Sequence, residues 1–111
     1  MDNAALDQMV QTYEGCTIAA FADFDVGIPL RTASGTRVGQ EALNMLCARA
    51  KTVFKPVPAS ALIAVEASEG VIYIFVRAQD DPASGLIAQI DHTVALDVFL
   101  EQAKTCMGHT T

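Results

Sequence analysis

The feature that most constrains the fold is an apolar stretch near the N-terminus that turns back on itself. Residues 16–23 predict a buried strand, and residues 28–32 predict a shorter strand that returns beside it. Between them, the segment Asp23-Phe24-Asp25-Val26-Gly27 carries the Asp and Gly residues typical of turns. Pro29 cannot donate a hydrogen bond to a neighbouring strand, which indicates that the returning strand lies at a sheet edge. The sequence therefore predicts a β-hairpin whose second strand forms one edge of a sheet.

The remaining patterns surround this hairpin with helices and add three more strands. Helical spacing is found in residues 3–14 and 38–54 and again in a last helix that begins after Asp91 or Thr93, while strand patterns cover residues 61–67, 71–77 and 86–90. This order predicts an α/β (α+β) fold with a single five-stranded antiparallel sheet sandwiched between one central helix and two terminal helices. We expect residues 1–111 to form one domain, with a frayed C-terminal tail at 108–111.

Composition excludes several classes of partner. Apolar residues make up 51% of the chain, which favours an oligomer, although a sheet covered on both faces also raises apolar content. A net charge of −6 argues against nucleic acid and against an anionic membrane surface. The acidic start and three cysteines without CxxC spacing predict a cytoplasmic protein with reduced thiols.

Three segments together resemble the roadblock family, the dynein light-chain roadblock superfamily. They are Glu14-Gly15 followed by Ala19-Ala20 and the turn to Leu30, then Val65-Glu66 through Glu69-Gly70-Val71-Ile72, and Gly85-Leu86-Ile87-Ala88 before the terminal helix. The resemblance covers about residues 5–105. It implies a non-enzymatic dimeric regulator or scaffold that binds a small Ras-like GTPase, another NTPase or a motor complex.

The resemblance also implies how two copies meet, through paired central helices and paired third strands. The dimer contacts expected on this basis are Leu43, Leu46, Cys47, Ala50, Leu62, Ile63 and Val65. Residues 61–67 support part of this expectation on their own, because an uncharged apolar strand at a sheet edge must be paired or protected. The alternative is a monomer in which Lys55-Pro56-Val57-Pro58 folds over that edge. For Cys47 a place in the core is the other interpretation.

Basic residues gather in the middle of the chain. Five of the seven lie between residues 31 and 55, and four of them are candidate partner contacts: Arg37, Arg49, Lys51 and Lys55. One interpretation is a positive patch that faces an acidic partner. The other is a solvated helix face whose late cations complement the helix C-terminus.

No pattern indicates a catalytic, cofactor or metal site, and an enzyme is the least favoured class. Asp80-Asp81 offers too few ligands for Ca²⁺, and Cys106 near His109 lacks a fixed base and orienter. The alternative to the scaffold is a small-molecule sensor. It would need a cavity between sheet and helix, which we would expect near Phe21, Met45, Tyr73 and Phe75.

Overall fold

The computed structural model describes residues 3–33, 39–58 and 60–109. In chain order the elements are α1 (Asn3–Thr12), β1 (Cys16–Asp23), β2 (Ile28–Thr32), α2 (Gln40–Val53), β3 (Ile63–Ser68), β4 (Val71–Arg77), β5 (Ser84–Asp91) and α3 (Leu96–Cys106). The predicted order is confirmed, and most boundaries shift by up to two residues within the described part of the chain. For example, β3 begins at Ile63 rather than at residue 61. The last helix is an exception, because it begins at Leu96 after Ala95 rather than directly after Asp91 or Thr93.

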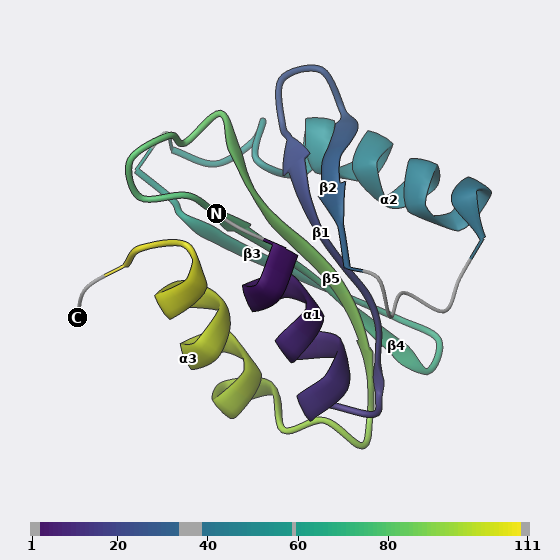
Figure 1. The fold of residues 1–111 in the computed structure, drawn as a ribbon. Coiled ribbons are helices and arrows are strands. Elements are labelled where there is room, and N and C mark those ends of the chain that lie inside the picture. The colour runs from purple at the N-terminus through teal and green to yellow at the C-terminus, as the bar shows by residue number, and fades with distance from the viewer. Residues whose placement is uncertain (1–2, 34–38, 59, 110–111) are drawn as a thin grey trace.

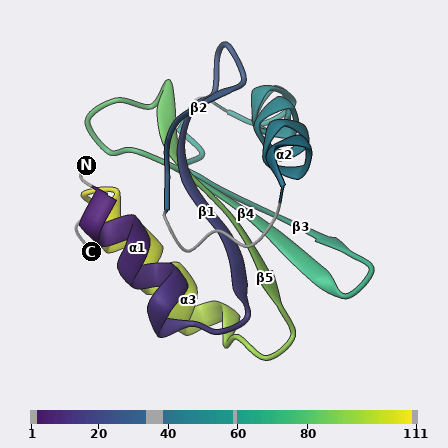
Figure 2. The same ribbon diagram turned by 45° about the vertical axis from the view of Figure 1, so that its right-hand side comes forward.

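The five strands form one antiparallel sheet in the order β2-β1-β5-β4-β3 (Figure 1). The β1–β2 hairpin and the β3–β4 hairpin are thus joined through β5, which lies in the middle of the sheet. As predicted, α2 covers one face and the terminal helices α1 and α3 lie together on the other (Figure 2). The strands β2 and β3 are the two edges.

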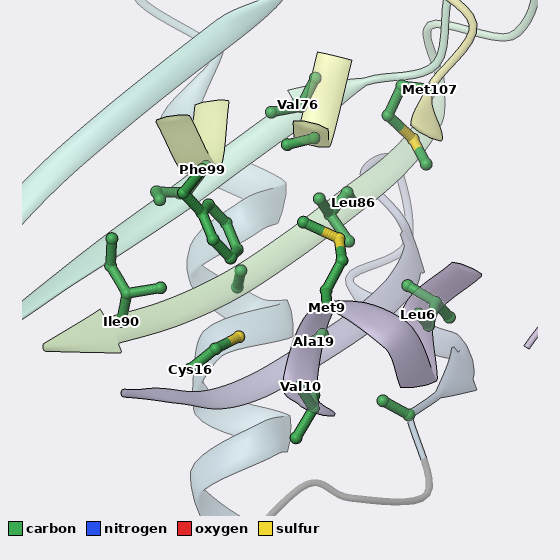
Figure 3. Packing of buried hydrophobic residues seen from close by; sticks show 14 of the residues in the cluster. Leu6, Met9, Val10, Cys16, Ala19, Val76, Leu86, Ile90, Phe99 and Met107 are labelled. Carbon is green, nitrogen blue, oxygen red and sulfur yellow. The ribbon is translucent and has the colours of Figure 1, made fainter. Parts of the chain in front are cut away.

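Each face of the sheet buries its own apolar cluster. Between the sheet and the α1–α3 pair lie Leu6, Met9 and Phe99 together with the inward side chains of β4 and β5 (Figure 3). Under α2 lie Leu43, Leu46, Cys47, Ala50 and Phe54, packed on the opposite face. Because both faces are covered, β1 reads as a continuous apolar run rather than as an alternating one.

The turn between β1 and β2 is held by one carboxylate and one glycine. Asp23 Oδ1 accepts the backbone N–H groups of Asp25 at 2.8 Å and Val26 at 2.9 Å. Gly27 has φ +80, and a Cβ there would lie 3.3 Å from both the Cys47 carbonyl oxygen and Lys51 Cβ. The turn therefore lies against the last turns of α2, and Asp23 has a structural role in it.

Among the described residues, none of the helices has the length and apolar character needed to cross a bilayer. The same residues contain no group of three or more His, Cys, Asp or Glu side chains that could hold a metal ion.

Candidate dimer and partner surfaces

The outer strand β3 exposes apolar side chains. Ile63 is 36% exposed and Val65 is 42% exposed, and the strand pairs with β4 alone in the described structure. Residues 56–58 are themselves exposed and leave these side chains uncovered. An apolar edge of this kind is a template for a further strand. Leu62 precedes the strand and is half-buried, with its carbonyl oxygen accepting the Arg77 N–H at 2.8 Å.

The four helix residues expected at the dimer contact face the sheet of their own protomer. Leu43 and Leu46 are each 4% exposed, Ala50 is 1% exposed and Cys47 is fully buried. Burial raises the pKa of the Cys47 thiol to about 11. The core interpretation of Cys47 therefore describes its position in the protomer. Any contact that α2 makes with a second copy must come from other side chains, of which Met45 is the most prominent at 68% exposed.

A groove of about 330 Å³ separates α2 from β3 and contains Met45, Arg49, Glu66 and Tyr73 among its lining residues. Arg49 forms an ion pair with Glu66, and its Nε donates to Glu66 Oε1 at 2.7 Å. The hydrogen bond and the charge of Arg49 hold the pKa of the Glu66 carboxyl below its usual value, despite an opposing effect of burial. Glu66 points to the α2 face of the sheet, whereas Ile63 and Val65, paired with Val76 and Ile74, point to the α1–α3 face. We call the open edge of β3, with the side chains that flank it on the two faces, the β3 surface: Met45, Arg49, Ile63, Val65 and Glu66.

The structure separates the basic residues that the sequence placed in one patch. Arg37 lies outside the described residues. Arg49 turns toward β3, whereas Lys51 and Lys55 line a different hollow beside the β1–β2 turn. Two residues along a helix correspond to a rotation of about 200°, so Arg49 and Lys51 project from opposite flanks of α2.

The cavity expected for a small-molecule sensor is not formed by the four residues proposed for it. Phe21 packs on the α1–α3 face of the sheet, while Phe75 is fully buried on the α2 face. Met45 and Tyr73 do share the groove beside β3. The expectation fails because neighbouring strand residues alternate between faces, which puts Phe21 on the wrong side.

The C-terminal cysteine and histidine serve packing. Cys106 Sγ lies 4.0 Å from Met9 Sδ, and burial raises the pKa of its thiol. His109 Nε2 is 2.7 Å from the Arg77 carbonyl oxygen. The two side chains thus have separate partners, which gives no support to a nucleophile and base pair.

The comparisons with known proteins rest on structure. No family model matches the sequence, and no curated protein matches it. A Roadblock/LC7 domain from Streptomyces avermitilis superposes with a TM-score of 0.79 at 10% identity, covering 96% of this chain and 92% of that one. Myxococcus xanthus MglB superposes with a TM-score of 0.73 at 13% identity, covering 96% and 88%. A structure described as MglB with a tetrameric arrangement gives 0.75 at 16% identity, covering 94% and 80%.

These superpositions extend over nearly the whole chain, and they match the predicted element order and sheet. The chain has the roadblock fold, an α+β sandwich of one five-stranded antiparallel sheet and three helices.

Proposed function

We propose that this protein is a non-enzymatic, cytoplasmic scaffold or regulator that works as a homodimer built on the β3 surface. The observation that carries the proposal is the open edge of β3, with Ile63 and Val65 exposed on one face of the sheet and the groove that holds Met45 on the other. A second copy placed there would pair β3 with β3 and cover these side chains. The two MglB superpositions add support at the level of the fold, and one of these structures is described as a tetrameric arrangement.

Light scattering over a dilution series tests the dimer. The expected mass is twice the 11.8 kDa of the chain, falling toward one chain only at high dilution. Val65→Lys should shift the protein to monomer because it puts an uncompensated charge on the edge strand. Val98→Lys is the matched control, since Val98 is 54% exposed on α3, a helix that contributes nothing to the β3 surface.

A monomer at all concentrations, or equal effects of the two lysine variants, would overturn the dimer. Circular dichroism of each variant separates loss of association from loss of folding.

The partner class that we propose is a small Ras-like GTPase or another NTPase, as the roadblock resemblance implies. Contact would run along the flank of α2 that the dimer leaves open, with Lys51 and Lys55 as cations toward an acidic surface. Arg49, which the sequence grouped with them, is paired with Glu66 on the opposite flank. The contact through the lysines would act by stabilising or remodelling a mobile region of the partner rather than by chemistry of this chain's own.

Calorimetric titration with a purified small GTPase, in its GDP form and bound to a non-hydrolysable GTP analogue, tests the partner class. We expect saturable binding that weakens with added salt, and weaker binding by the Lys51→Glu, Lys55→Glu double variant than by the parent. Absence of binding in both nucleotide states would refute the GTPase as a partner. It would not bear on the dimer, which light scattering tests separately.

A further inference from the structure

A second hollow lies on the flank of α2 that faces away from β3. Its volume is about 460 Å³, and its walls come from three separate parts of the chain. The β1–β2 turn contributes Phe24 and Asp25, the end of α2 contributes Ala50 to Lys55, and the end of β4 with the following loop contributes Arg77, Pro82 and Ala83. We call this the Lys51 hollow. The proposed GTPase contact also uses Lys51 and Lys55, but it does not use Arg77 or the space that the hollow encloses.

The arginine of the hollow is held in place before any ligand arrives. The Arg77 guanidinium carbon lies 4.2 Å from the centroid of the Phe54 ring, and Phe54 in turn packs against Phe24 with ring centroids 5.4 Å apart. The backbone of Arg77 is fixed from both sides, since its N–H donates to the Leu62 carbonyl oxygen and its own carbonyl oxygen lies 2.7 Å from His109 Nε2. A side chain ordered in this way loses little freedom when it binds an anion.

The two lysines are anchored by their stems and exposed at their ends. Lys51 Cβ and Cδ lie within 3.5 Å of the position that a Cβ on Gly27 would take, so the stem runs along the β1–β2 turn. Within the described residues neither Lys51 nor Lys55 takes part in an ion pair. Their ammonium groups are available to a ligand.

The charge balance of the hollow is opposite to that of the protein. Three cations line it and Asp25 is the one acid among its lining residues, in a chain of net charge −6. The C-terminus of α2 adds a partial negative charge of about −0.5, which leaves the hollow positive by about 1.5 charges. Because the negative net charge of the chain disfavours anion binding over the rest of its surface, we expect an anion that binds to do so in this hollow.

We propose that the Lys51 hollow binds a small molecule that carries phosphate groups. The planar guanidinium of Arg77 suits two oxygens of one phosphate, and the flexible ammonium groups suit the remaining negative charge. The volume lies within the range typical of small-ligand sites and far exceeds what a single carboxylate side chain fills. Among the apolar lining residues Pro82 is exposed and Ala83 is half-buried, so these two offer a surface for the uncharged part of the molecule, whereas Phe24 and Phe54 are buried.

The test is a titration of the purified, isotope-labelled protein with sodium tripolyphosphate and, separately, with ATP in the absence of magnesium, followed by backbone amide resonances. We expect saturable shifts confined to residues 24–27, 50–55, 77 and 82–83, with a dissociation constant below about 1 mM. Lys51→Gln with Lys55→Gln should weaken binding at least about tenfold, because two close charges are lost. Arg31→Gln with Lys104→Gln is the control that removes the same charge outside the hollow.

Tighter binding of ATP than of tripolyphosphate would identify a nucleotide as the source of the phosphates, and equal binding would identify an inorganic polyphosphate. Either result supports the site. The proposal is overturned if no resonance shifts up to about 10 mM probe, or if the control variant weakens binding as much as the hollow variant does. Light scattering of the same samples reports the oligomeric state independently. If the protein proves to be a monomer, the binding results still decide whether the hollow is a phosphate site.

Discussion

Replacement of Phe54 by leucine tests how far the aromatic pair and the arginine above it stabilise this flank of α2. Phe54 is 6% exposed, packs against Phe24 and lies under Arg77. Loss of volume alone costs about 1.5 kcal/mol. Loss of the ring pair adds about 1 kcal/mol, and loss of the half-buried cation–π contact adds about 1 kcal/mol more. The variant should therefore unfold with a free energy about 3.5 kcal/mol below that of the parent.

Phe75→Leu is the matched control. Phe75 belongs to the same buried cluster, and in the described residues it makes no ring–ring or cation–π contact. It should lose only the volume term, about 1.5 kcal/mol. In urea denaturation at one fixed protein concentration, the midpoint of Phe54→Leu should lie about 1 M below that of Phe75→Leu. Equal midpoints would refute the assignment of energy to the ring contacts of Phe54.

Three further outcomes follow from the packing and the shifted pKa values. Gly85→Ala should cost about 3 kcal/mol in urea denaturation, because its Cβ would lie 2.1 Å from the Val76 carbonyl oxygen and push β4 from β5; an unchanged midpoint would contradict that register. Cys47, whose pKa is about 11, should resist iodoacetamide at pH 8 in the folded protein and react in denaturant, as read by peptide mass spectrometry; rapid native labelling would mean that the helix opens. The Glu66 carboxyl has a lowered pKa when folded, so its pairing with Arg49 stabilises the fold above the usual carboxyl pKa and loses that effect as the pH falls. The difference in unfolding free energy between the parent and Glu66→Gln should shrink from pH 7 to pH 3. A difference that grows as the pH falls would contradict a stabilising role of the ionised Glu66 carboxyl.

The element order and the two-sided sheet could be predicted because the pattern of each segment is local. The turn at Asp23 to Gly27 and the edge position of the strand with Pro29 follow from single-residue chemistry. The register was beyond reach, including the irregularity between Phe21 and Ala22 where β1 meets β2, because it depends on packing across strands.

The candidate surfaces show a different limit. The split between Arg49 and Lys51 could have been found from helix geometry, since two residues on a helix lie on opposite flanks. Met45, two positions after Leu43, is exposed for the same reason. Arg77 could not have been assigned, because only the fold brings the end of β4 beside the end of α2.

The geometry of α2 gives the proposed dimer and the proposed phosphate site separate flanks of one helix. Its buried side is occupied by the sheet, its Arg49 flank faces β3, and its Lys51 flank faces the β1–β2 turn. A second copy paired along β3 would cover the first flank and leave the other, so each dimer would carry two Lys51 hollows. Ligand in these hollows would then stabilise the fold by an amount set by ligand concentration, whereas the dimer would add stability that depends on protein concentration. Thermal unfolding measured against ligand concentration and, separately, against protein concentration should resolve the stabilisation by ligand from the stabilisation by dimerisation. A ligand effect that vanishes in the Val65→Lys monomer would show instead that the hollow is completed only by the second copy.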